Sequence, residues 1–138
     1  MTSVYLLDTN VVSYIARGRS NAARQKLLNL KHDEVACISA ITEAEIRYGL
    51  AKRPQASELK RLMEGFLASI RILPWGSNEA EAYGELRAKL EAAGLMLGNM
   101  DMMIAAHAVT TNAILVTNDK AFSLVDSLSA TANWATDV

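Results

Sequence analysis

Short apolar segments with strand character alternate along the whole chain with longer segments of helical periodicity. The strand-like segments are residues 3–7, 34–39, 70–74 and 113–117. Hydrophobic side chains recur every three or four residues over 10–17, 21–30, 41–51, 56–69 and 100–111, and in a long helix that Ser77 caps and Gly94 follows. Strands that alternate with helices are typical of a parallel sheet covered by helices on both faces. We therefore expect an α/β fold with a mostly parallel central sheet.

The bulk composition predicts one soluble domain spanning residues 1–138. The chain has 138 residues and 51% hydrophobic residues, enough for one core, and it contains no repeat. The single Cys37 excludes an internal disulfide and fits a reducing cytoplasm. We find no signal peptide and no apolar run of about 18 residues, so we expect a cytoplasmic protein without a membrane span. The net charge of −1 argues against nucleic-acid binding by bulk electrostatics but leaves room for a local basic surface.

Acidic side chains follow the predicted strands at the points where these end. In a parallel sheet such positions share one edge, and ligands bind there where the strand order reverses. Asp8 comes directly after the first strand, and Asp101 opens the helix over 100–111. The other candidates are Glu43 and Glu45 in the first turns of the helix over 41–51, and Asp119 after the last strand.

If one of the two glutamates joins the three aspartates, four carboxylates at one edge would repel one another and raise each other's pKa. A divalent cation removes this repulsion, and Mg²⁺ and Mn²⁺ prefer carboxylate, water and phosphate oxygens as ligands. Such an ion lowers the pKa of a bound water and stabilises charge on a transferring phosphoryl group. An acidic cluster without Cys or His therefore points to phosphodiester chemistry more than to zinc.

Each acid also has a structural interpretation. Asp8, Asp101 and Asp119 are all placed where a helix cap or a first-turn acid is common. Glu43 and Glu45 point about 200° apart on a helix and cannot both face one pocket. Spacing relative to Ile41 and Tyr48, which we expect on the core-facing side, favours Glu45.

Four ordered motifs resemble those of the PIN-domain ribonucleases, and among them the VapC toxins of bacterial toxin–antitoxin pairs. They are LLDTNVVSYI, ISAITEAEIRYGL, LGNMDMMIAAHA and VTNDKAF, and together they cover nearly the whole chain. The resemblance implies an α/β/α sandwich and an acidic site that binds Mg²⁺ or Mn²⁺ and cleaves single-stranded RNA. It also implies a homodimer, a cognate VapB antitoxin whose C-terminal segment lies across the site, and a higher toxin–antitoxin assembly. The implied substrate is tRNA, and for the most similar VapC proteins the anticodon stem-loop of initiator tRNA.

The same resemblance assigns roles to individual residues. Asp8, Glu45, Asp101 and Asp119 correspond to the four catalytic and metal-binding acids, of which the last is the most variable in the family. Glu43 departs from the family, which has a neutral residue there, and is either a bystander or an outer acid. The expected hydrogen-bond partners of the acids are Thr9, Asn10 and Thr117.

Scattered basic and aromatic side chains are weaker candidates for RNA contacts. The best placed are Arg17, Arg19, Arg47 and Arg87, whose phosphate contacts would make binding sensitive to salt. For Tyr48 and Trp75 we expect core packing or a place in a subunit interface rather than stacking on bases. His107 lies six residues after Asp101, so it points away from that acid and we expect a structural role.

Rival functions place an acid after the first strand as well. A haloacid-dehalogenase-like phosphatase needs a second Asp two residues after the first, where this chain has Asn10, and a phospho-receiver domain needs an acidic pair there. A non-catalytic binding module on the same fold and a Mg²⁺-dependent DNA nuclease remain as alternatives to an endoribonuclease.

Overall fold

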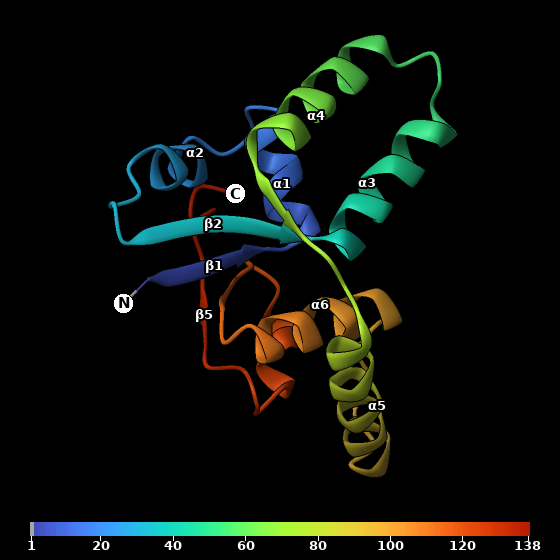
Figure 1. Cartoon of the computed structure of the whole chain (residues 1–138). Coiled ribbons are helices and arrows are strands. Elements are labelled where there is room, and N and C mark those ends of the chain that lie inside the picture. Colours follow the sequence, from blue (N-terminus) through green and yellow to red (C-terminus); the bar gives the residue numbers. More distant parts are fainter. Residues whose placement is uncertain (1) are drawn as a thin grey trace.

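The computed structural model describes residues 2–138 and contains a five-stranded, wholly parallel sheet of order β3-β2-β1-β4-β5 (Figure 1). The strands are β1 (Ser3–Leu7), β2 (Glu34–Ser39), β3 (Arg71–Leu73), β4 (Ile114–Val116) and β5 (Ala130–Ala132). The helices are α1 (Thr9–Ala16), α2 (Asn21–Leu28), α3 (Ala40–Lys52), α4 (Ser57–Ser69), α5 (Ser77–Ala92), α6 (Asn99–Thr110) and the short 3₁₀ helix η1 (Lys120–Leu124).

The chain reverses its direction of travel across the sheet at β1. From β1 it moves outward to β2 and β3, and it then returns to the other side of β1 to form β4 and β5. The ladders align Leu7 with Val116 and Leu6 with Cys37. The residues that follow β1, β2 and β4 therefore lie level with one another at the same edge of the sheet.

Two apolar layers enclose the sheet and confirm the predicted α/β/α arrangement. Leu7, Ile38 and Val116 point to one face, where they pack with residues of α1, α2, α3 and α4. The adjacent strand residues point the other way and pack with α5, α6 and η1. This alternation follows from the strand period of two, and both faces are apolar because helices cover both.

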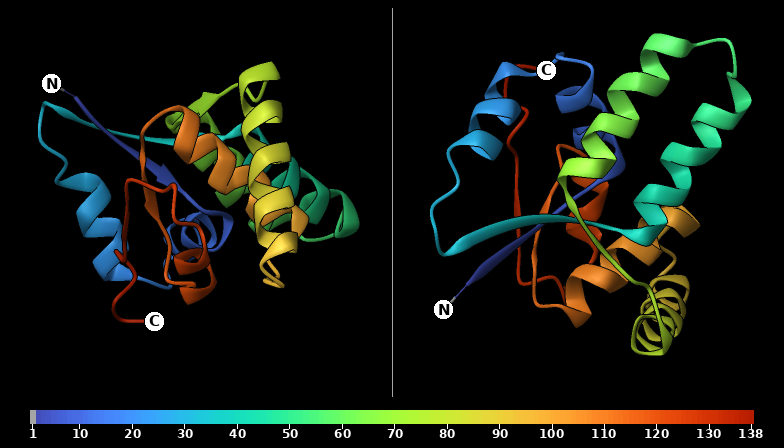
Figure 2. Two further views of the ribbon diagram at one scale, coloured as in Figure 1. Left: turned by 90° about the horizontal axis from the view of Figure 1, so that it is seen from below. Right: turned by 45° about the horizontal axis from the view of Figure 1, so that its top comes forward.

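Helices α3 and α4 form an antiparallel pair that projects beyond the sheet, as Figure 1 and the right-hand view of Figure 2 show. Only part of α3 is covered as a result. Thr42 and Ile46 are buried, whereas Tyr48 is 65% exposed, so the expected core-facing side through Ile41 and Tyr48 was wrong. The side chain of Tyr48 is therefore not packed in the core, while its expected place in a subunit interface stays a prediction.

Other boundaries differ from the sequence expectations in small ways. Gly76, not Ser77, is the N-cap of α5, and its amide donates to Glu79 Oε1 over 2.9 Å. Neither β5 nor η1 was expected from the sequence. In the part of the chain that the structure describes, no helix has the length and apolarity needed to cross a membrane.

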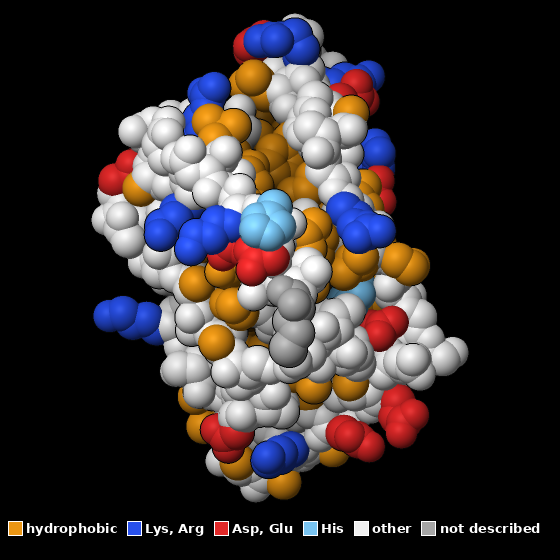
Figure 3. Space-filling model, turned by 60° about the vertical axis from the view of Figure 1, so that its left-hand side comes forward, with side chains coloured by type: hydrophobic (Ala, Val, Ile, Leu, Met, Phe, Trp, Pro, Cys, Tyr) orange, Lys and Arg blue, Asp and Glu red, His pale blue; other side chains and the backbone are white. Residues whose placement is uncertain are grey.

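Charged side chains of both signs are interspersed on the side of the molecule shown in Figure 3. Lys and Arg lie next to Asp and Glu there, and hydrophobic atoms are visible between them in a surface hollow. This mixed surface agrees with the net charge of −1. Attraction for a polyanion would therefore have to come from a local group of cations.

Candidate functional site

Asp8 is a buried carboxylate at the end of the central strand. It is 4% exposed, its amide donates to the carbonyl of Val116 over 3.0 Å, and its Oδ1 accepts from the Val11 amide over 2.9 Å. The side chain thereby caps α1, which begins at once after β1. The capping interpretation of Asp8 is thus confirmed, and it fixes the carboxylate at the edge of the sheet where the strand order reverses.

The pKa of Asp8 is raised, first of all because burial disfavours the charged form. Hydrogen bonds from the Thr117 hydroxyl and the Val11 amide oppose this effect. The negative charges of Asp101 and Asp119 raise the pKa further, so both acids lie close enough to act on Asp8. Thr117 follows β4 as Asp8 follows β1, and the strand register explains why the two side chains meet.

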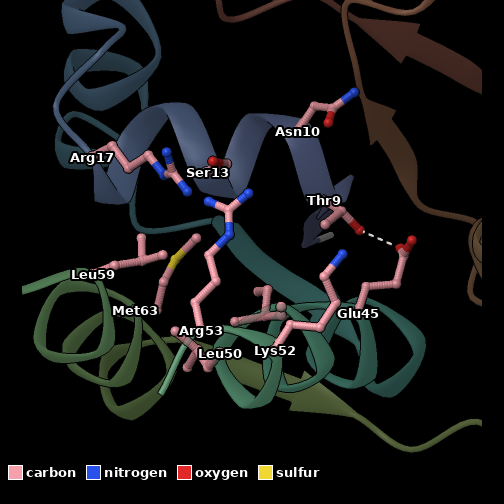
Figure 4. Close-up of a pocket in the computed structure, with 12 residues that line it drawn as sticks. Thr9, Asn10, Ser13, Arg17, Glu45, Leu50, Lys52, Arg53, Leu59 and Met63 are labelled. Atoms are coloured by element: carbon pink, nitrogen blue, oxygen red, sulfur yellow. Dashed lines mark hydrogen bonds between the residues drawn. The ribbon is translucent and has the colours of Figure 1, made fainter. Parts of the chain in front are cut away.

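Glu45 is tied to the start of α1. The hydroxyl of Thr9 donates to Glu45 Oε1 over 2.6 Å and lies 3.4 Å from the hydroxyl of Thr42 (Figure 4). Glu43 points elsewhere and forms an ion pair with Arg47 over 2.9 Å on the surface of α3. The structure therefore brings Glu45, and not Glu43, to the edge that carries Asp8.

Asp101 lies half-buried in the first turn of α6. Its pKa is raised by burial, then by the negative charges of Glu45 and Asp119. The charges of Asp101 and Asp119 raise the pKa of Asp8, and those of Glu45 and Asp119 raise the pKa of Asp101. The four predicted carboxylates are therefore near enough to form one electrostatic group. They come from the ends of β1 and β4 and the N-terminal turns of α3 and α6.

Asp119 is the most exposed of the four. Its Oδ1 accepts from the Ala121 amide over 2.9 Å and caps η1, while its own amide donates to Thr117 Oγ1 over 3.0 Å. Thr117 thus contacts both Asp8 and Asp119 and holds the two acids around one hydroxyl.

His107 connects the two helices that carry Glu45 and Asp101. Its Nδ1 lies 2.8 Å from Ser39 Oγ, and Ser39 caps α3 by accepting from the Ile41 amide over 3.0 Å. His107 is 1% exposed, and burial lowers its pKa, so the ring is held in its neutral form. The expectation of a structural role agrees with this placement.

The donor chemistry of the edge fits a hard divalent cation. All four side chains are carboxylates, and the raised pKa values of Asp8 and Asp101 arise in part from repulsion that a cation would reverse. Among residues 2–138, however, no three His, Cys, Asp or Glu side chains are grouped closely enough to hold one ion between them. The carboxylates converge as an open group rather than as a closed ligand cage.

The remaining sequence candidates are placed less uniformly. Asn10 and Arg17 line a cavity that Glu45 also borders. Arg47 is paired with Glu43, and Arg87 on α5 is paired with Glu91 over 2.9 Å, while Arg19 is exposed. Lys52 and Arg53 line the same cavity, and sequence reasoning gave them no role. Both follow the helix that was expected over 41–51.

Comparison with known proteins reveals relatives along nearly the entire chain. A family model described as PIN domain matches residues 5–128. A protein named Ribonuclease VapC2 from Rickettsia felis is 35% identical over 132 residues, which cover 95% of this chain and 98% of that protein. A protein named tRNA(fMet)-specific endonuclease VapC from Shigella flexneri is 32% identical over 132 residues, with the same shares covered.

A solved structure shows the same fold. The crystal structure of VapBC2 from Rickettsia felis bound to a DNA fragment from their promoter contains a chain with a TM-score of 0.87 and 34% identity. The match covers 95% of this chain and 98% of that one. The α/β/α fold described above therefore recurs in that protein.

Proposed function

The chain belongs to the PIN-domain family and, within it, to the VapC ribonucleases, and on this premise we propose that it is a metal-dependent endoribonuclease. The observation that carries the proposal is the coupling of four carboxylates at the edge of the sheet where the strand order reverses. Carboxylates that raise one another's pKa destabilise the fold, and a site that binds a divalent cation gives a reason for the arrangement.

In the proposed site, Asp8, Glu45, Asp101 and Asp119 would hold Mg²⁺ or Mn²⁺. When bound, such an ion would activate a water and stabilise negative charge on the scissile phosphate. Asp8 is positioned by its capping bond to α1 and by the hydroxyl of Thr117. The hydroxyl of Thr9 orients Glu45. For Asp8, the donors from Thr117 and Val11 favour the ionised carboxylate, which is the form that binds a cation.

The proposed substrate is single-stranded or loop RNA, and specifically tRNA, with the anticodon stem-loop of initiator tRNA as the first candidate. A relative named as a tRNA(fMet)-specific endonuclease supports this choice. The proposed partner is a VapB-type antitoxin, supported by the VapBC2 complex from Rickettsia felis. We further propose one domain over residues 1–138, a homodimer, and a cytoplasmic location, which follow from the family resemblance and the composition.

Cleavage of total bacterial RNA by the purified, antitoxin-free protein tests the proposal. We expect discrete fragments from the tRNA fraction in Mg²⁺, none in EDTA, and none with Asp101→Asn, whose neutral side chain has nearly the same shape. Mapping the fragment ends identifies the cleaved loop. Equal cleavage by the parent protein and Asp101→Asn would contradict the assigned site. If single-stranded DNA is cleaved and RNA is not, the substrate is DNA and the protein is a DNA nuclease. If neither RNA nor DNA is cleaved and Mg²⁺ does not bind, the chain is a binding module.

A further inference from the structure

A pocket between α1 and the α3–α4 pair adjoins the acidic edge. Its volume is about 250 Å³, and we call it the α1–α3 pocket. Thr9 and Glu45 form one end of it, Leu59 and Met63 contribute an apolar side, and Arg17, Lys52 and Arg53 bring positive charge (Figure 4). An acidic end that continues into a cationic pocket is unlike the mixed surface of Figure 3.

The cations of this pocket have no carboxylate partners. Each ion pair found in residues 2–138 joins two residues of one helix elsewhere, such as Arg61 with Glu58 over 2.6 Å. In Figure 4 the guanidinium groups of Arg17 and Arg53 point toward each other, from the end of α1 and from just after α3. Like charges that converge in this way repel each other, and a bound anion would reverse that repulsion.

Arg17 also has an unused hydrogen-bond donor. Its Nε is buried and, within residues 2–138, has no hydrogen-bond partner. A buried donor without a partner loses its hydrogen bond to water and gains nothing in return, so such groups are rare unless a ligand or a water satisfies them. A guanidinium presents several donors in a fixed fork that matches the oxygens of a phosphate.

The cations follow Glu45 along one side of α3. Gly49 and Lys52 come four and seven residues after Glu45, so they lie on successive turns of the same helix face, and Arg53 follows directly after the end of α3. At a rise of about 1.5 Å per residue, Lys52 lies roughly 10 Å from Glu45 along the axis. Gly49 lacks a side chain, which leaves the path between the two turns open.

We propose that the α1–α3 pocket binds a backbone phosphate of the RNA strand, adjacent to the phosphate that is cleaved, through Arg17, Lys52 and Arg53. This inference rests on the proposed function and names the part of the protein that holds the strand in register. The apolar side chains of Leu59 and Met63 border the site and lower the local dielectric, which strengthens the attraction between the cations and a phosphate.

A ribonucleic acid fits this pocket better than an acidic protein segment does. The pocket is continuous with the carboxylates at Glu45, so its ligand must tolerate a cation-binding site directly beside the cationic one. A polynucleotide presents phosphates at regular intervals, and one can lie at the acidic edge through a cation while its neighbour lies in the pocket. The nearby Tyr48, exposed and within 5.1 Å of the Lys52 ammonium, offers an aromatic face to a base of the same strand.

The salt dependence of RNA binding tests the proposal. A fluorescein-labelled oligouridylate would be titrated with the protein in EDTA, where no cleavage is expected, at several salt concentrations. For single strands the slope of log K against log salt changes by about 0.7 for each phosphate contact that is lost. We expect Arg17→Gln and Arg53→Gln each to make this negative slope less steep by about this amount. Arg61→Gln removes an equal charge outside the pocket and is expected to bind as the parent does.

The outcomes separate this proposal from the proposed function. Parent-like slopes for both Arg17→Gln and Arg53→Gln, in a protein that still cleaves RNA in Mg²⁺, would overturn the phosphate site and leave the nuclease intact; the cations would then serve a protein partner. If the parent protein neither binds nor cleaves RNA, both proposals fall. Arg53 is exposed, so Arg53→Gln retains the fold even if Arg17→Gln does not, and thermal melting of each variant verifies this.

Discussion

At the scale of single residues, Asp8 caps α1 and, in the proposed site, would also bind a cation, and the two tasks depend on different properties of its side chain. Capping α1 requires an oxygen that accepts the Val11 amide, whereas binding a cation requires a negative charge. The sequence pointed to both tasks because an acid follows an apolar strand and precedes an apolar helix. It could not show that Thr117 would contact the same carboxylate, since that contact depends on the register between β1 and β4.

Substitution at Asp8 should separate these two tasks. Asp8→Asn keeps an accepting oxygen and removes a buried charge, so we expect thermal stability equal to or above that of the parent. Cleavage should fall at least about a hundredfold, since a metal ion contributes several kcal/mol to catalysis. Asp8→Ala should lose the cap as well, at a cost of about 1 kcal/mol in the free energy of unfolding. Melting curves and RNA cleavage rates measure both; parent-like cleavage by Asp8→Asn would show that the acid is only a cap.

At the scale of elements, most helices and strands could be predicted because each has a clear hydrophobic period and a cap or break at its ends. The exceptions have physical causes. Strand β5 is three residues at the edge of the sheet and carries no long apolar pattern. Helix α3 projects beyond the sheet, so no hydrophobic core covers its exposed half. Tyr48 lies on that half and is not packed in the core. The helical spacing and the family motif both favoured Glu45, although the core-facing side on which the spacing argument relied was wrong.

The link between α3 and α6 should respond to acid. Burial lowers the pKa of His107 below its ordinary value of 6.5, so the unfolded chain binds a proton more readily than the folded one. The stabilisation is present above that value and is lost as the pH falls through the lowered pKa, by up to about 1.4 kcal/mol per pH unit. The variant His107→Gln cannot titrate at this position. We expect its melting temperature to fall less than that of the parent as the pH is lowered through this range. Parallel losses in the two proteins would show that His107 is not the responding group.

At the scale of the whole molecule, the acidic edge exists only because distant segments meet. Asp8, Glu45, Asp101 and Asp119 could be proposed from sequence, since parallel strands bring their ends to one edge. The α1–α3 pocket could not, because it depends on how α3 and α4 project past α1. The open arrangement of the carboxylates was likewise not evident from their spacing.

Divalent cations should therefore stabilise the folded protein as a whole. An ion that binds only the native state at a hundred times its Kd adds about 2.7 kcal/mol to the free energy of unfolding. We expect Mg²⁺ or Mn²⁺ to raise the melting temperature of the parent protein and to have a much smaller effect on Asp101→Asn. In metal-free buffer we expect Asp101→Asn to melt higher than the parent at neutral pH, because it removes a carboxylate whose pKa is raised by burial and by neighbouring charge. If the metal raises the melting temperature of both proteins equally, the cation binds elsewhere on the protein.

The most direct test of the central claim compares Glu45→Gln with Glu43→Gln. Both substitutions neutralise one glutamate in the first turns of α3, but only Glu45 contacts Thr9 and acts on Asp101. The measurement is the rate of cleavage of one labelled tRNA in Mg²⁺ under single-turnover conditions. If the four converging carboxylates form the active site, Glu45→Gln loses most of its activity and Glu43→Gln cleaves as fast as the parent. Parent-like cleavage by Glu45→Gln, or a loss confined to Glu43→Gln, would contradict this account.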